Sequence, residues 1–419
     1  MAILHVGVVM RRWPTRTLPA VLLVLGLACS ACDTTSPASG AGGTPSSTSG
    51  KPVSRPPRVS KPSPQLVPPS CPAEVFSRLT EAQRVGQLFL VGLAGDPVSG
   101  VAQAVTAYHF GSLLSAGNLT AGVAGLRQLT RGYQALASSR GTGKVRFFIA
   151  GNQEGGEVQS LQGPGFAPMP SALVQGGLSV AVLQQQAALW GRELRSAGFN
   201  LDLAPVMDVV PPGTAAQNQP IGMLQREFGD SPATVAAHGV AFIRGMVQAG
   251  VATAAKHFPG LGRVTGNTDF TAGVVDSTTG PHDPDLRSFQ DAIDAGVPFV
   301  LVALATYTRI DPRHLAAFSP QVMRVILRQQ MHFKGVVVSD DLGAATAVAD
   351  LSPGIRGIDF LAAGGDLITS QSLPAAAAMD SAIRARVTAD SAFRALVNSA
   401  VMRVLSAKQA YHLLPCPQR

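Results

Sequence analysis

Eight short apolar runs, separated by stretches with helical spacing, restrict the fold of this 419-residue chain more than any other feature of its sequence. Each run is continuously apolar and lacks the alternation of a strand with one face in water, which is typical of strands covered on both faces. The runs are QLFLVGLAG (87–95), GSLLS (111–115), VRFFIA (145–150), FNLDLAP (199–205), VATAAKHF (251–258), PFVLVAL (298–304), GVVVSDD (335–341) and GGDLITS (364–370). Their number and order predict an α/β fold with a single (β/α)8 barrel of the TIM type.

The segments between these runs carry helix signals. The clearest helix is expected over 232–249, where Ser231 can cap the first turn, Pro232 suits the start and Gly250 can end it. An open, doubly wound sheet is the alternative architecture. No GxGxxG follows the first run, which disfavours that alternative.

The N-terminal residues resemble an export signal. Three arginines between positions 11 and 16 precede a short apolar stretch at 18–28, which is too short to span a bilayer and suits a secretory signal; Met10 is an alternative start. Small residues and two cysteines follow, as in a bacterial lipobox. We therefore expect a signal peptide over 1–32 with lipidation at Cys32. Cys29, or a signal peptide without lipidation, remains an alternative.

Residues 33–72 are rich in Ser, Thr, Pro and Gly and are expected to form a tether. Residues 1–70 hold seven of the 33 basic side chains and one of the 25 acidic ones. Most of the net charge of +8 therefore belongs to this segment, and the rest of the chain is nearly neutral. The pI of 9.7 consequently gives no reason to expect a nucleic-acid partner.

The folded domain is expected over 73–415, with Cys71 and Cys416 at its two ends. In an oxidising compartment such a pair predicts a disulfide, because the first and last elements of a barrel are neighbours. Two buried free thiols are the alternative.

Polar residues follow several of the apolar runs at the point where each predicted strand ends. In a barrel these carboxyl ends lie on one rim, which is where chemistry takes place. The residues concerned are Asn152, Glu154, Asp208, Lys256, His257, Asp340 and Asp341. A rim of solvated loops would explain any one of them, but it explains their recurrence less well.

Asp340 follows three valines, so its carboxylate would be held on a rigid strand and partly desolvated, which suits a nucleophile. One member of the pair Asp340 and Asp341 could instead cap the next turn. The Lys256–His257 pair suits hydrogen bonds to substrate hydroxyls, and Arg226 could clamp a polar substrate group. Two carboxylates without a His pattern are weak evidence for a metal, so neither a metal nor a cofactor is implied.

The segments NQEGGEVQSL, GFNLDLAPVMDV, REFGD, AAKHFPGLG and GVVVSDDL, in this order, resemble glycoside hydrolase family 3 in its single-domain β-N-acetylglucosaminidase branch. The resemblance covers about residues 75–413. It implies a retaining mechanism with Asp340 as nucleophile. It also implies substrate binding by Lys256, His257 and Arg226. Asn152 and Asp208, which belong to the same motifs, are likewise expected to bind substrate.

The chain departs from the family pattern at three positions. Asn152 stands where the family has Asp, and Leu261 stands where it has a second His. The family's mobile loop carries a catalytic His, and counting from Lys256 without a gap places Asp269 there. We therefore expect Asp269 to be the general acid/base. A role of Asp269 in stabilising a turn is the alternative reading, and Asp276 and His282 are further candidates for the acid/base.

From the resemblance we expect a retaining exo-β-N-acetylglucosaminidase that acts on peptidoglycan fragments or muropeptides in cell-wall turnover. The protein would be a monomer, anchored as a lipoprotein on the outer face of the cytoplasmic membrane. A β-glucosidase of the same family, and a non-catalytic glycan-binding lipoprotein, are the alternatives.

Overall fold

The computed structural model describes residues 70–416, and this part of the chain forms a closed barrel of eight parallel strands. The strands follow one another around the barrel in chain order, and β13 pairs with β1 to close it. They are β1 (Phe89–Ala94), β2 (Ser112–Ser115), β3 (Phe148–Gly151), β6 (Leu201–Asp202), β7 (Ala252–Phe258), β9 (Phe299–Val302), β12 (Val336–Asp341) and β13 (Leu367–Ser370). The predicted (β/α)8 fold is confirmed. Each of the eight apolar runs coincides with one barrel strand, and only β3 extends past its run, by one residue, to Gly151.

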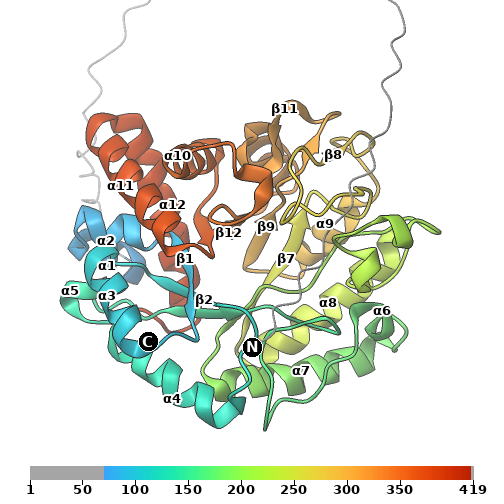
Figure 1. The fold of residues 1–419 in the computed structure, drawn as a ribbon, viewed down its shortest axis with the longest axis horizontal. Helices are drawn as coiled ribbons and strands as arrows, with labels where there is room; N and C mark the ends of the chain where they lie inside the picture. Colours follow the sequence, from blue (N-terminus) through green and yellow to red (C-terminus); the bar gives the residue numbers. More distant parts are fainter. Residues whose placement is uncertain (1–69, 417–419) are drawn as a thin grey trace, which may run out of the picture. The chain divides into compact units, whose positions relative to one another are not determined.

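Helices surround the barrel (Figure 1). The α-helices are α1 (Cys71–Arg78), α2 (Glu81–Gly86), α3 (Val98–Tyr108), α4 (Gly122–Ala135), α5 (Ser139–Thr142), α6 (Ala172–Gln175), α7 (Val180–Ala197), α8 (Pro232–Gln248), α9 (Leu286–Asp294), α10 (Pro353–Ala363), α11 (Leu373–Ala389) and α12 (Ser391–Ala410). Shorter or tighter turns are η1 (Ala215–Gln217), η2 (Gly222–Leu224), η3 (Ala316–Phe318) and η5 (Thr346–Val348), and η4 (Gln321–Gln330) is wound as a π-helix.

The barrel strands are buried on both faces, which explains why the apolar runs do not alternate. Every residue of β2, β3, β6, β7, β9 and β13 is buried. Side chains pointing inward fill the barrel, while those pointing outward pack under the helices.

Local signals in the sequence set several helix starts. Thr80 and Gln83 form a reciprocal capping box at the start of α2. Ser231 accepts a hydrogen bond from the Thr234 backbone N–H at the start of α8, and Pro232 occupies its first position. The predicted helix over 232–249 is therefore present, with Ala249 as its C-cap.

Five small strands lie at the rim formed by the carboxyl ends of the barrel strands. The sequence analysis did not predict them. β4 (Gln153–Gly155) and β5 (Val158–Gln159) form a hairpin directly after β3. β8 (Val275–Asp276), β10 (Thr306–Tyr307) and β11 (Asp311–Leu315) form a separate three-stranded sheet. Strands of two or three residues leave no detectable periodicity, and the five residues of β11 (DPRHL) show no alternation of apolar and polar side chains. Both sheets lie in loops that follow barrel strands and therefore shape the mouth of the barrel.

A disulfide joins Cys71 to Cys416, with their Cα atoms 6.2 Å apart. It connects the first turn of α1 with the segment after α12, as the two cysteines at the domain ends predict. Since α1 begins at Cys71, Cys71 and Pro72 belong to the folded domain, and the tether predicted over 33–72 extends two residues too far. The expected signal peptide and lipidation site at Cys32 lie outside the described residues.

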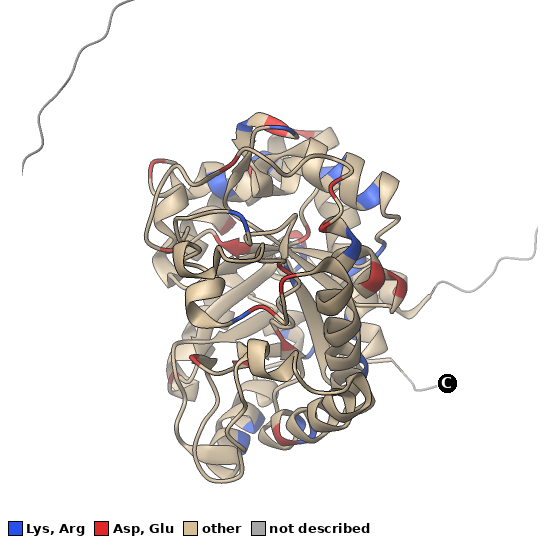
Figure 2. Cartoon of the chain, turned by 90° about the vertical axis from the view of Figure 1, so that its right-hand side faces the viewer, with Lys and Arg blue, Asp and Glu red and all other residues tan. Residues whose placement is uncertain are grey.

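Within residues 70–416, no helix combines the length and the apolar character needed to cross a bilayer. Basic and acidic residues are scattered over the described elements, and most positions carry neither charge (Figure 2).

Candidate active site

A pocket of about 350 Å³ lies at the carboxyl ends of the barrel strands. Most of the residues singled out in the sequence line it, although they come from distant parts of the chain. These are Asn152 after β3, Arg226 after η2, Lys256 and His257 in β7, Asp269 after β7, and Asp340 and Asp341 at the end of β12. Its volume lies in the range of small-molecule binding sites.

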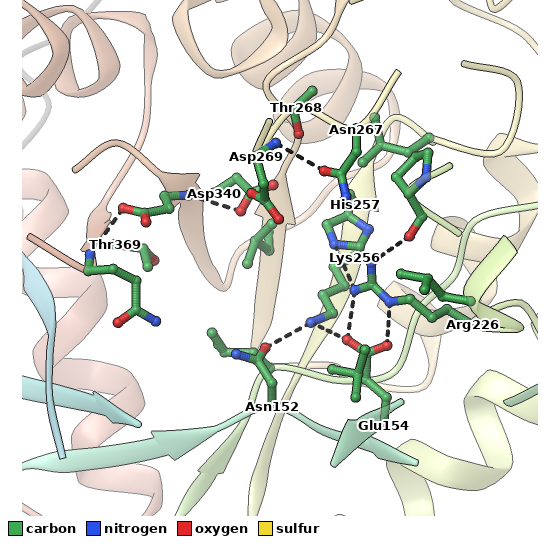
Figure 3. A pocket seen from close by; sticks show the side chains of 18 of the residues that line it. Asn152, Glu154, Arg226, Lys256, His257, Asn267, Thr268, Asp269, Asp340 and Thr369 are labelled. Atoms are coloured by element: carbon green, nitrogen blue, oxygen red, sulfur yellow. Dashed lines mark hydrogen bonds and ion pairs between the residues drawn. The ribbon is translucent and has the colours of Figure 1, made fainter. Parts of the chain in front are cut away.

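An ion-pair cluster forms the floor of the pocket. Glu154 accepts two hydrogen bonds from Arg226, at 2.7 Å from Nε and 2.8 Å from Nη2. The Lys256 Nζ lies 2.7 Å from Oε1 of the same carboxylate, the oxygen that also accepts from the Arg226 Nη2. The side chains of Glu154 and Lys256 are 2% and 4% exposed. Glu154 therefore fixes both cations of the site in one geometry (Figure 3).

The electrostatics of this cluster favour the charged forms of Glu154 and Arg226. Burial alone would raise the pKa of Glu154, but the Arg226 and Lys256 charges and their hydrogen bonds lower that pKa to about 2. Burial alone would lower the pKa of Arg226, but the charge of Glu154 raises it. One carboxylate thus serves two buried cations, which leaves the cluster with one net positive charge facing the pocket.

Glu154 was expected on the predicted rim, but the sequence analysis assigned it no role in the site. It lies in the NQEGG segment, two positions after Asn152, so the segment itself was the available signal. Its two partners are 72 and 102 positions away in the chain, and periodicity cannot reveal such contacts.

Asn152 is held by the same lysine. Its Oδ1 accepts a hydrogen bond of 3.0 Å from the Lys256 Nζ. Its side-chain amide nitrogen, Nδ2, has no hydrogen-bond partner among residues 70–416, and the Asn152 side chain lines the pocket. The amide can therefore donate to a substrate hydroxyl where the family's carboxylate could only accept.

His257 is oriented by Asp208. The His257 Nδ1 lies 2.7 Å from Asp208 Oδ2, and the His257 backbone N–H donates to Asp208 Oδ1 at 3.1 Å. Nδ1 is thus paired with this carboxylate, which leaves Nε2, 3.5 Å from the Arg226 Nη2, for a hydrogen bond with a ligand.

Asp208 itself is not a substrate-binding residue, which corrects the expectation from the sequence. It is wholly buried and does not line the pocket. It also accepts a hydrogen bond of 2.8 Å from the backbone N–H of Leu261, the residue that replaces the family's second His. Asp208 therefore fixes the backbone at Leu261 and the orientation of the His257 imidazole.

Asp340 and Asp341 have different roles, as the two sequence readings of this pair allowed. Asp341 Oδ1 accepts hydrogen bonds from the backbone N–H groups of Gly343, Ala344 and Gln371, at 2.8 to 3.1 Å. Asp341 thus fixes the turn after β12. Within the described residues 70–416, the Asp340 carboxylate accepts only from the Asp341 backbone N–H, at 2.9 Å, and it faces the pocket. Asp340 is therefore free to react.

Asp269 lies at the exposed rim of the same pocket, next to Asp340 (Figure 3). The turn that carries it is stabilised by Asn267, whose Oδ1 accepts from the Asp269 backbone N–H at 3.0 Å. The Asp269 carboxylate makes no hydrogen bond within the described part of the chain. The alternative in which the Asp269 side chain stabilises the turn is therefore disfavoured.

The environment raises the pKa of Asp269. Partial desolvation of its carboxyl is the largest cause, and the negative charge of Asp340 adds to it, while His257, Arg226 and Lys256 act in the opposite direction. A raised pKa is what a carboxyl group needs to donate a proton near neutral pH.

The other two candidates for this role lie outside the pocket. Asp276 is 2% exposed and accepts four hydrogen bonds from the backbone and hydroxyl groups of Thr278 and Thr279. His282 is exposed and does not line the pocket. Asp276 therefore stabilises a turn, and Asp269 is the carboxyl placed beside Asp340.

Replacing Glu154 by Ala is expected to lower the free energy of unfolding by about 3–5 kcal/mol, because Arg226 and Lys256 then remain buried without their anion. Urea denaturation of the variant measures this loss. Glu157→Ala is the matched control, since Glu157 is exposed and forms no ion pair in the described structure. A change below about 1 kcal/mol for Glu154→Ala would contradict the assigned role.

The sign of the pH dependence follows from the same cluster. The pKa of Glu154 in the folded protein lies below its ordinary value of 4.5, at about 2. The stabilisation from this carboxylate is therefore complete above pH 4.5 and is lost as the pH falls towards 2.

The chain is similar to known glycosidases over most of the described region. A family model described as the glycosyl hydrolase family 3 N terminal domain matches residues 80–407. A β-hexosaminidase of Stenotrophomonas maltophilia (strain R551-3) is 35% identical over 212 residues, which are 48% of this chain and 59% of that protein. The match thus spans less than two thirds of the length of this curated relative.

Two solved structures are similar over a larger share of the chain. The β-N-acetylhexosaminidase from Beutenbergia cavernae has 47% sequence identity and a TM-score of 0.76, covering 79% of this chain and 99% of that one. A glycoside hydrolase family 3 β-N-acetylglucosaminidase from Paenibacillus has 27% identity and a TM-score of 0.71, covering 81% of this chain and 64% of that one.

Proposed function

The chain belongs to glycosyl hydrolase family 3, and on that premise we propose that it hydrolyses terminal β-linked N-acetylglucosamine by a two-step, retaining mechanism. The observation that carries this proposal is the placement of two carboxyl groups in one pocket. Among residues 70–416, the Asp340 carboxylate accepts a hydrogen bond only from the Asp341 backbone N–H, and Asp269 beside it has a raised pKa. A carboxylate free to attack and a neighbouring carboxyl with a raised pKa are what a retaining glycosidase requires.

In the first step, the Asp340 carboxylate attacks the anomeric carbon of the sugar. The bond from that carbon to the bridging oxygen breaks, and Asp269 gives its proton to the departing oxygen. The products are a glycosyl ester on Asp340, a released alcohol and an Asp269 carboxylate.

In the second step, the Asp269 carboxylate takes a proton from water while the water oxygen attacks the anomeric carbon. The ester bond to Asp340 breaks, which restores the Asp340 carboxylate and the protonated Asp269. The electrostatics favour this cycle, because the negative charge of Asp340 contributes to the raised pKa of Asp269. Esterification removes that charge, which lowers the pKa of Asp269. Its carboxylate form is therefore favoured in the step in which it must act as a base.

The floor of the pocket binds the sugar in this account. Lys256, the Nε2 of His257 and Arg226 present hydrogen-bonding groups from buried, fixed positions. Asn152 adds an amide donor. The similar proteins named as β-hexosaminidases and β-N-acetylglucosaminidases support N-acetylglucosamine as the sugar.

Hydrolysis assays with the purified protein test this function. We expect release of nitrophenol from the 4-nitrophenyl β-glycoside of N-acetylglucosamine, and a much lower kcat/KM for the corresponding β-glucoside. Preference for the glucoside would support the β-glucosidase alternative. Binding of N-acetylglucosamine without turnover of either substrate would support a non-catalytic glycan-binding protein.

The proposed setting is the outer face of the cytoplasmic membrane, with peptidoglycan fragments as substrates. It is supported by the signal-like composition of residues 1–32 and by the Ser/Thr/Pro/Gly-rich segment that follows. Full-length protein expressed in a host that lipidates exported proteins should partition into a detergent phase, and Cys32→Ala should move most of it into the aqueous phase. Cys29→Ala is the matched control. Loss of partitioning with Cys29→Ala alone would reassign the lipid to Cys29.

A further inference from the structure

Phe270 is exposed at the mouth of the pocket. Its exposed fraction is 79%, the highest of the large hydrophobic side chains in the described part of the chain. It lines the pocket together with Asp269, its neighbour in sequence. An aromatic ring left this open in the free protein leaves apolar area that a ligand can cover.

The fold holds Phe270 in place. Its backbone N–H donates to the Asn267 carbonyl at 3.0 Å, which closes the turn. The preceding segment is tied to the loop after β12, because Thr346 N–H donates to the Asp269 carbonyl at 3.1 Å and Ala347 N–H donates to the Thr268 carbonyl at 3.0 Å. Asp269 and Phe270 are therefore presented together, on the side of the pocket that β12 and its Asp340 define.

We propose that the Phe270 ring binds the leaving group of the substrate and forms a platform for it. This proposal rests on the proposed function of Asp269 as general acid. The general acid must contact the bridging oxygen, which is the boundary between the retained sugar and the leaving group. Consecutive Cα atoms are 3.8 Å apart, so Phe270 lies beside that boundary. The retained sugar occupies the buried, charged floor around Glu154 and Lys256, and the leaving group extends outward past Phe270.

This position selects the chemical class of leaving group. A pyranose ring carries axial C–H groups that make an apolar face, and an aryl group is apolar on both faces, so either can cover the Phe270 ring. A leaving group without a ring gains nothing from it. The site therefore favours substrates in which N-acetylglucosamine is linked to a second ring, such as another sugar residue.

Three substrates with N-acetylglucosamine as the retained sugar test this platform. The disaccharide of β-1,4-linked N-acetylglucosamine has a ring and needs a proton to depart. The 2,4-dinitrophenyl glycoside has a ring and departs without a proton. The glycosyl fluoride has no ring and also departs readily. Comparing the dinitrophenyl glycoside with the fluoride measures the contact between Phe270 and the leaving-group ring. Any effect on proton donation by Asp269 is left out of this comparison, because neither leaving group needs a proton.

Phe270→Ala should lower kcat/KM about tenfold for the disaccharide and the dinitrophenyl glycoside, and by less than about twofold for the fluoride. Phe270→Tyr should restore wild-type values. Met223→Ala is the matched control, because Met223 is 59% exposed but does not line the pocket. It should leave all three substrates unaffected.

Failure of the proposed function and failure of the Phe270 platform give different results. If the wild-type protein hydrolyses none of the three substrates, the proposed function itself is wrong. If Phe270→Ala lowers only the disaccharide rate, Phe270 positions Asp269 and binds no leaving group. Equal loss on all three substrates, or a change in oligomeric state by light scattering, would also overturn the platform.

Discussion

Replacing Asp340 by Ala is expected to reduce kcat/KM on every N-acetylglucosaminide by roughly 10⁴-fold or more, because the covalent intermediate can no longer form. The fold should survive, since the Asp340 carboxylate accepts a single hydrogen bond from its neighbour, whereas Asp341 fixes the turn after β12. Circular dichroism and thermal unfolding check the fold, and steady-state rates check the activity.

Two controls make this result specific. Asp350→Ala changes an exposed carboxylate shortly after the same strand and should leave activity unaltered. Azide or formate should restore turnover of an activated aryl substrate by Asp340→Ala, with inverted stereochemistry at the anomeric carbon. An Asp340→Ala protein that retains more than a few per cent of its activity would assign the nucleophile to another residue.

Replacing Asp269 by Ala is expected to affect substrates according to their need for a proton. On a natural disaccharide kcat/KM should fall by about 10²–10⁴-fold, since a sugar alkoxide departs poorly without an acid. On the 2,4-dinitrophenyl glycoside kcat/KM should change little, because that leaving group needs no proton. The kcat on the aryl substrate should fall, because the second step has lost its base, and azide should restore it as a glycosyl azide forms. Equal losses on both substrates, with no effect of azide, would remove Asp269 from the mechanism.

The pH dependence of the wild-type protein should follow the same group. Asp269 must be protonated in the first step, and its pKa is raised by desolvation and by the charge of Asp340. The value of kcat/KM on a disaccharide should therefore fall as the pH rises through that raised pKa. Asp340→Asn should lower the pKa of Asp269, which carbon NMR of the labelled carboxyl can follow without any turnover.

The barrel and its rim could be predicted from local sequence. Continuous apolar runs predicted the eight strands because both faces of each strand are covered, and residues after the runs were therefore expected at one rim. Lys256, His257, Arg226 and Asp340 do line the pocket there. Family resemblance was needed to assign roles, because the position of a strand end does not show which of Asp340 and Asp341 is the nucleophile.

Other features of the site depend on contacts between distant segments and could not be predicted. Glu154 gains its role only because Arg226 and Lys256 are folded onto it. Asp208 was expected to bind substrate, but its burial beneath His257 makes it a supporting residue. The placement of Asp269 beside Asp340 depends on two backbone hydrogen bonds from Thr346 and Ala347, and such bonds carry no residue-specific signal.

Trapping the intermediate tests the central claim most directly. A 5-fluoro derivative of N-acetylglucosaminyl fluoride reacts through its good leaving group and then hydrolyses slowly, so the covalent form accumulates. Intact-mass analysis should show one added sugar per protein, and peptide mapping should place it on Asp340, with no adduct in Asp340→Ala. An adduct on another residue, or turnover of the substrate with inverted product and no adduct, would contradict the account.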